Sequence, residues 1–271
     1  MNIPQSDDEV SSFQAKNYEV KGKDYLKRGL EIFKASPFEL VMSGVLAFIC
    51  GIILNKIPRV GFILNLPFTA FVEVGYFILI TKTANSQKVV LPDFFKVFDL
   101  PKEVFFTAIM QIIINYAFTL VLLIPIIIFA IWYVITAGDT SIFMAPLGNI
   151  TSKEVIAYLS KNYLILIVGI VYLLVIGFSV LIVNLLMIFS VLIKMETKLG
   201  IKNSFIVSFR LMSKKIFTWA FSYLFLIIIG LFVIIFTLGF GVLFLGPLYK
   251  CVVYAAYEDL RGAKTLEAEI V

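Results

Sequence analysis

The chain has 271 residues, of which 61% are hydrophobic and only 15% are charged. An ordinary soluble domain carries about 25% charged residues, so this composition excludes a soluble globular protein and predicts an integral membrane protein. The chain contains no His, which excludes His-based metal sites and Ser-His-Asp catalysis. Cys50 and Cys251 lie in apolar runs, so we interpret both as buried hydrophobic side chains and expect no cofactor.

The hydropathy pattern predicts an all-α, polytopic membrane protein with six transmembrane helices in three hairpins. Residues 1–37 are charged and predict a cytoplasmic segment that contains an amphipathic helix, rather than a signal peptide. The membrane domain is expected over 38–260, followed by a cytoplasmic tail over 261–271. Apolar runs long enough to approach the ~20 residues of a span cover 38–54, 60–81, 104–136, 163–193, 216–237 and 242–257.

The distribution of basic residues predicts the orientation. Of the 23 Lys and Arg residues, 19 fall in the N-terminal segment, in the 82–102 and 194–215 loops, and from residue 250 onward. Cytoplasmic loops carry an excess of Lys and Arg, so both termini are expected in the cytoplasm.

Two of the predicted helices are too long for an upright crossing. At 1.5 Å per residue, 104–136 and 163–193 would reach roughly 46–50 Å, whereas the hydrocarbon core is about 30 Å thick. A kink at Pro125, a steep tilt or a covering partner would each accommodate the excess. We therefore expect their outer halves and the 137–162 loop to contact another membrane protein or a second copy of the chain.

Three predicted cytoplasmic segments are amphipathic. Leu26, Leu30 and Phe33 recur at helical spacing, and the segments 201–212 and 94–98 show a similar apolar pattern. Such helices lie in the membrane interface, with Phe buried and Lys extended toward anionic headgroups. They either help to set topology or recognise a lipid or partner. The basic residues expected at the interface are Lys27, Arg28, Lys202, Arg210, Lys214 and Lys215.

The two outer hairpins share a pattern of Gly and Pro. Gly61 and Pro67 open the second predicted helix, and Gly241 and Pro247 open the sixth, with the same spacing of six residues. We expect the first and third hairpins to be pseudo-equivalent, with bends at these four residues and at Pro125.

A few polar side chains lie inside the predicted spans. Glu73 and Lys250 lie at similar depths on the pseudo-equivalent helices, so we expect them to face the bundle interior, where they could pair. They could form a proton or substrate relay, a structural ion pair, or two side chains that reach the interface separately. Gln111, Asn115 and Asn184 could hydrogen-bond between helices or line a polar groove for a ligand.

Three runs of sequence carry a resemblance to a known group. The segments 91–98, 198–212 and 241–260 resemble those of bacterial six-helix membrane proteins that are common in Bacteroidetes and largely of unknown function. They are also similar to the membrane domain attached to some glycerophosphoryl diester phosphodiesterases. The resemblance implies a six-helix fold and a bacterial inner-membrane location, but no activity. Family members tend to have a Pro-Gly turn between helices three and four, whereas here Pro125 has no such Gly and an insertion follows.

The sequence favours a non-enzymatic inner-membrane protein that binds a lipid or a partner protein, such as an accessory subunit of a membrane complex. The alternative is a small transporter or an oligomeric channel that uses Glu73, Lys250, Gln111, Asn115 and Asn184. A lipid-modifying enzyme would need a pocket that joins Glu73 to a nucleophile, and no spacing indicates one. We expect the lipid bilayer and no nucleic acid as a partner.

Overall fold

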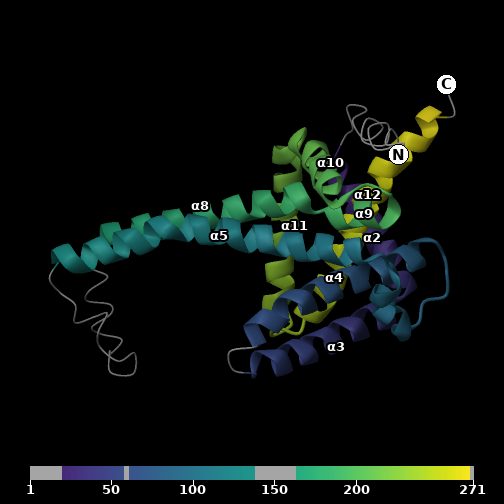
Figure 1. Cartoon of the computed structure of the whole chain (residues 1–271), viewed down its shortest axis with the longest axis horizontal. Helices are drawn as coiled ribbons and strands as arrows, with labels where there is room; N and C mark the ends of the chain where they lie inside the picture. Colours follow the sequence, from purple (N-terminus) through teal and green to yellow (C-terminus); the bar gives the residue numbers. More distant parts are fainter. Residues whose placement is uncertain (1–19, 58–60, 138–162, 269–271) are drawn as a thin grey trace. The chain divides into compact units, whose positions relative to one another are not determined.

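The computed structural model describes residues 20–57, 61–137 and 163–268, which form helices and no strand. These residues belong to two compact units, one of 1–113 with 184–271 and one of 114–183. Apart from Ala137, the predicted partner loop lies outside the described residues. In chain order the helices are α2 (Gly22–Ala35), α3 (Pro37–Asn55), α4 (Gly61–Ala84), η1 (Leu91–Asp99), α5 (Lys102–Ala137), α8 (Tyr163–Met187), α9 (Ser190–Glu196), α10 (Ile201–Ser213), α11 (Ile216–Phe236) and α12 (Val242–Ala268) (Figure 1).

Among the described residues, five helical segments are long and apolar enough to cross a bilayer, as in a multi-pass membrane protein. The sixth predicted span, 242–257, is not among them. It lies within α12, which contains Lys250 in its first half and becomes rich in charged residues from Glu258 onward. The five segments are Pro37–Asn55, Ile63–Ala84, Lys102–Ile128, Gly169–Glu196 and Ile216–Phe236.

Two helices form the centre of the first unit. Every residue from Val74 to Ile80 of α4 and from Cys251 to Tyr257 of α12 is buried. A helix that is buried on all faces must have neighbours on every side. Here α2, α3 and η1 pack against these two helices, which also contact each other.

Helix α2 packs on α12 through a face that the sequence pattern did not predict. Its buried residues are Tyr25, Gly29 and Ile32 rather than Leu26, Leu30 and Phe33. A Cβ at Gly29 would lie 2.8 Å from the Cα atom of Val252, so the two backbones approach closely. The apolar stripe predicted from the sequence is therefore not the contact face of α2, because a tyrosine and a glycine make the tertiary contact, and its predicted position in the membrane interface stays a prediction.

The predicted amphipathic segment 94–98 lies within the 3₁₀-helix η1, which packs on α4. Phe94 is buried, and its ring stacks edge-on against Phe71 at a centroid distance of 5.4 Å. Phe98 remains 79% exposed. Only part of this aromatic segment is therefore available to a membrane interface.

The fourth predicted helix is interrupted. Helix α8 ends at Met187 and the short helix α9 begins at Ser190, so the single helix predicted over 163–193 is wrong at its end. The break allows Ser208 Oγ of α10 to donate to the Leu186 carbonyl at 2.9 Å. On α10, the buried residues are Ser204, Val207, Ser208, Leu211 and Met212, while Phe209 of the predicted apolar stripe is exposed.

The second unit contains the later part of α5 and most of α8, which run in a similar direction (Figure 1). Tyr172 Oη donates to the Leu122 carbonyl at 2.9 Å. Helix α5 continues without interruption through Pro125. Many apolar side chains of this pair are exposed, among them Leu120, Val121, Ile127, Ile128, Leu173 and Leu174.

The shared Gly and Pro pattern falls at equivalent places in α4 and α12. Gly61 and Gly241 are both buried where their helices begin. A Cβ at Gly61 would collide with the Leu54 carbonyl, and one at Gly241 would lie 2.6 Å from Thr237 Oγ1. Both helices continue through Pro67 and Pro247, and the bends predicted at these prolines stay predictions.

Candidate functional site

The two ionisable residues predicted inside the membrane form an ion pair. Lys250 Nζ of α12 lies 2.6 Å from Glu73 Oε1 of α4 and 5.2 Å from the centroid of the Phe77 ring. The two side chains are 24% and 11% exposed, respectively. The pairing predicted from the sequence is therefore present, whereas a role as a relay stays a prediction.

The position of this pair divides α4 and α12 into two parts. Glu73 immediately precedes the buried run that starts at Val74, and Lys250 immediately precedes the run that starts at Cys251. Two charges of opposite sign that leave water together offset part of their desolvation cost. The pair therefore closes one end of the packed core and joins its two central helices.

The three predicted amides have different surroundings. Gln111 Oε1 accepts a hydrogen bond from Ser190 Oγ at 2.8 Å, and both residues are buried. Asn115 Oδ1 is buried without a hydrogen-bond partner within the described part of the chain. Asn184 is exposed, and its predicted role in a hydrogen bond between helices or in a polar groove stays a prediction. Sequence reasoning missed Ser190 because a serine in an apolar run gives no signal of its partner.

The six basic residues predicted at the interface are all exposed. Arg28 Nε lies 3.3 Å from Glu258 Oε2, which links α2 to α12. The same two helices are joined by Tyr25, whose Oη donates to Asp259 Oδ2 at 3.0 Å. At least one of these basic residues therefore holds the fold together rather than only facing lipid.

A second ionic cluster anchors η1 to α4. Asp93 is buried, and its Oδ1 lies 2.7 Å from Lys82 Nζ and 2.8 Å from Lys96 Nζ. Its Oδ2 accepts from the Val90 N–H at 3.1 Å. Burial raises the pKa of this carboxyl, but the hydrogen bonds from Lys82, Lys96 and Val90 outweigh burial and lower the pKa to about 2. This cluster is saturated and leaves no free acid for chemistry.

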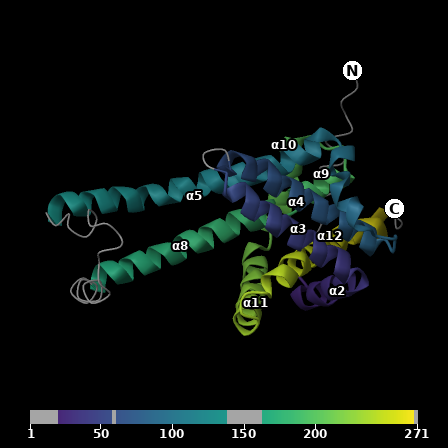
Figure 2. The ribbon, with the colours of Figure 1, turned by 90° about the horizontal axis from the view of Figure 1, so that it is seen from below.

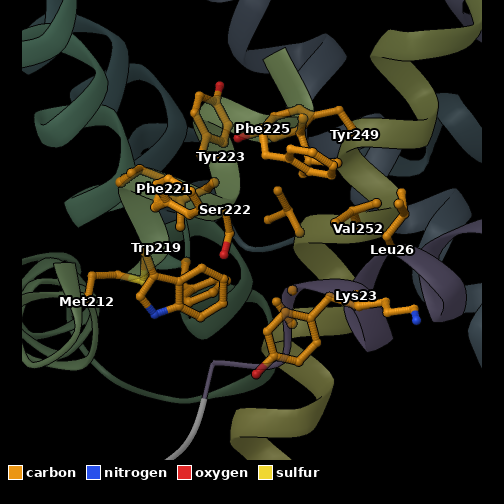
Figure 3. A pocket seen from close by; sticks show the side chains of 18 residues that line it. Lys23, Leu26, Met212, Trp219, Phe221, Ser222, Tyr223, Phe225, Tyr249 and Val252 are labelled. Carbon is orange, nitrogen blue, oxygen red and sulfur yellow. The ribbon is translucent and has the colours of Figure 1, made fainter. Parts of the chain in front are cut away.

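An apolar groove lies between α2, α11 and α12, and the sequence reasoning did not find it. Its larger part has a volume of about 450 Å³ and is lined by Leu26, Trp219, Leu226, Val252 and other residues of these helices and of the end of α8. Figure 3 shows Trp219, Phe221 and Ser222 on one side, with Val252 and Leu26 opposite. This volume lies within the range of about 300–1,000 Å³ that is typical of ligand pockets.

The groove continues along α11. A second part of about 320 Å³ is lined by Gly230 and Ile234 of α11 and by Leu245 and Gly246 of α12. The two parts share five lining residues, namely Leu26, Tyr223, Leu226, Tyr249 and Val252. We call the two parts together the α11 groove. From Trp219 to Ile234 the groove follows about 22 Å of helix, at 1.5 Å per residue.

Polar atoms occur mainly at one end of the α11 groove. Tyr25 and Trp219 stack with ring centroids 5.5 Å apart, and Lys23 and Ser222 belong to the lining at the same end. In the middle, the rings of Tyr223 and Tyr249 meet edge-on at 5.3 Å. Towards Gly230 and Leu245 the lining side chains are aliphatic. The groove is therefore amphipathic along its length.

The described residues offer no group of three or more His, Cys, Asp or Glu side chains that could hold a metal. Cys251 is buried and Cys50 is half-buried, and both are free thiols. The α11 groove contains no carboxylate among its lining residues. Its chemistry is that of a binding surface for an apolar molecule with a polar end.

No known protein family, no curated protein and no solved structure matches the chain. The resemblance to bacterial six-helix membrane proteins therefore stays a prediction from the sequence. The α11 groove is an apolar concave feature of this chain and is its candidate binding site.

Proposed function

We propose that this protein is a non-enzymatic, lipid-binding protein of the bacterial inner membrane, and that the α11 groove holds a lipid acyl chain. The observation that carries the proposal is the groove itself. It is lined mainly by apolar side chains and runs beside α11, a helix of membrane-spanning length.

The length of the groove supports a lipid chain as the occupant. About 22 Å of helix borders the groove, whereas one leaflet contributes about half of a ~30 Å hydrocarbon core. A chain that enters at the Trp219 end would therefore run through its own leaflet and reach past the middle of the bilayer. Side chains of α11 outside the groove lining are apolar and exposed at Leu224, Ile228 and Phe232, as expected for a helix with lipid on both sides.

We infer the orientation of the groove in the membrane from the distribution of basic residues. With both termini in the cytoplasm and six spans, the Lys23 end of the groove lies at the cytoplasmic surface. Helix α12 would then be the sixth span, with the Glu73–Lys250 pair supplying the neutralisation that a charge at this depth requires. The exposed apolar surfaces of α5 and α8 remain our proposed contact with a partner protein or a second copy.

Transport is the rival function, and the described geometry offers it little support. Glu73 and Lys250 already satisfy each other, and neither is among the lining residues of the α11 groove. Gln111 is likewise engaged with Ser190. A transport function would require a path to these groups that the α11 groove does not supply.

The test is to fill the groove and to count retained lipids. Leu226 lines both parts of the groove, and Leu226→Trp should occupy its middle. Native mass spectrometry of protein released from a mild detergent should show one bound lipid or more per chain, with the number reduced in this variant. Phe232→Trp, on an exposed part of α11, is the matched control and should retain lipid like the original chain. Equal retention in all three proteins would contradict the proposal.

A further inference from the structure

We infer that the α11 groove selects a phospholipid with an anionic headgroup, which it holds at the end where α2 and α11 begin. This inference rests on the proposed function and specifies the class of ligand. Moving an acyl chain from the bilayer into an apolar groove exchanges one apolar surrounding for another, so the tail adds little hydrophobic driving force. Selectivity must therefore come mainly from the polar end of the groove.

Two lysines precede the stacked aromatic pair of that end in equivalent positions, Lys21 just before α2 and Lys215 just before α11. The Tyr25 N–H donates to the Lys21 carbonyl, and the Trp219 N–H donates to the Lys215 carbonyl, both at 3.0 Å. Each lysine is therefore one helical turn before a member of the stacked Tyr25–Trp219 pair. Aromatic rings with a polar edge are typical of the headgroup level of a membrane.

A third lysine and a hydroxyl lie at the same end. Lys23 and Ser222 both line the groove, and in Figure 3 the Ser222 hydroxyl points towards its interior. The start of α2 lies close to α11 here, as shown by the 3.0 Å that would separate a Cβ at Gly22 from Ser222 Oγ. The Lys23 ammonium is directed away from the centre in Figure 3, which places it at the rim, where a headgroup rather than a tail would lie.

The charge at this end favours a net negative headgroup. Lys21, Lys23 and Lys215 are exposed, and none of the three forms an ion pair within the described residues. Among the described acids of α2 and of the facing part of α12, Asp24 is exposed, Asp259 already accepts from Tyr25, and Glu258 lies 3.3 Å from Arg28 Nε. A zwitterionic headgroup would bring its own cation towards these lysines, whereas an anionic headgroup would not.

The size of the expected preference follows from the binding free energy that one lysine contributes near an anionic lipid, about 1 kcal/mol. Each such lysine favours the anionic lipid by about fivefold. Three lysines, partly offset by Asp24, predict a preference for an anionic over a zwitterionic lipid of at least about fivefold. The aliphatic end near Gly230 and Leu245 would take the tail of either lipid.

The experiment is a competition in nanodiscs that contain phosphatidylglycerol and phosphatidylethanolamine in equal amounts with matched acyl chains. The full chain is released in the gas phase, and the retained lipids are identified by native mass spectrometry. We expect at least about fivefold more phosphatidylglycerol on the original chain. The double variant Lys23→Gln/Lys215→Gln should retain lipid but lose the preference, whereas Lys27→Gln, an exposed lysine of α2 outside the groove lining, should keep it.

The outcomes separate this inference from the proposed function. Retention of both lipids in equal amounts by the original chain would overturn the headgroup inference and leave acyl-chain binding intact, as long as Leu226→Trp still reduces retention. A preference that survives in Leu226→Trp would also overturn the inference, because the lysines would then act on lipids outside the groove. Failure of the original chain to retain any lipid would overturn both. The competition on the original chain decides the inference even if the double variant does not fold.

Discussion

Helices α4 and α11 are both of membrane-spanning length but have very different surroundings. Both are long and apolar enough to cross a bilayer. However, 50% of the residues in the most apolar stretch of α4 are buried, whereas only 11% are buried in that of α11. Helix α4 is surrounded by α2, α3, α12 and η1, whereas α11 packs mainly at its beginning, where Trp219 and Ala220 are buried. Figure 2 shows α11 and α2 beside α12.

This difference shows why the groove is at α11. In lipid, an apolar helix gains little from burying its surface against another helix, so close packing depends on shape and on specific polar contacts. Helix α4 has both, with its ion pair to Lys250 and the anchor of Lys82 to Asp93. Helix α11 is joined to α12 by the edge-on contact of Tyr223 with Tyr249, and the space around that contact is open.

Two leucines, one on each helix, test this difference in packing most directly. Leu79 of α4 is completely buried, whereas Leu231 of α11 is 54% exposed. Leu79→Ala should lower the free energy of unfolding by about 3–4 kcal/mol because it leaves a cavity. Leu231→Ala should cost less than about 0.5 kcal/mol, as is usual for surface substitutions. Unfolding in detergent followed by circular dichroism would measure both, and equal losses would show that α11 packs as tightly as α4.

The ion pair gives the next largest expected effect. Glu73→Gln leaves the Lys250 ammonium without its counter-charge, and we expect a loss of about 2–3 kcal/mol because the pair is only partly exposed. The double variant Glu73→Gln/Lys250→Met removes both charges and should recover most of that stability. Thermal melts of the purified proteins would test this, and a silent Glu73→Gln together with a silent Lys250→Met would show that the pair does not join α4 to α12.

The close contact of α2 with α12 predicts a smaller loss. A Cβ at Gly29 would lie 2.7 Å from Val252 Cγ2 and 2.8 Å from the Val252 backbone, so Gly29→Ala should destabilise the protein by about 1–3 kcal/mol. Gly177→Ala in α8 is the matched control, because nothing lies within 4 Å of its added Cβ. Thermal melts should place the control at or above the original chain. If Gly29→Ala left the melting temperature unchanged, α2 would move away from α12 without loss of stability.

The Asp93 cluster predicts a loss of stability in acid. The pKa of Asp93 is lowered from 3.8 to about 2 in the folded protein, so the folded state favours the ionised carboxylate. Its contribution is therefore fully present above about pH 4 and disappears as the pH falls towards 2. We expect it to be on the order of 1–2 kcal/mol. Melts of the original chain and of Asp93→Asn between pH 6 and pH 2 should converge at low pH, and parallel curves would contradict this assignment.

Much of the fold could be predicted from local sequence. The apolar runs predicted all five of the spanning segments found in the described residues, because length and hydropathy depend only on neighbouring residues. The Glu73–Lys250 pair could be foreseen because both residues occupy the same depth in helices that share a Gly and Pro pattern. The partner of Gln111, which is Ser190, could not be predicted, because a small hydroxyl side chain in an apolar run does not indicate what it contacts.

The sequence by itself determined that this chain is an apolar, helical membrane protein without histidine chemistry, because composition sets which solvent each segment tolerates. Only the tertiary structure decided that Tyr25 and Gly29 rather than Leu26 and Leu30 form the contact face of α2. It alone decided that α11 leaves a groove beside α12. The physical reason is that membrane helices are nearly uniformly apolar, so the faces that pack are chosen by shape and by a few polar contacts rather than by hydropathy.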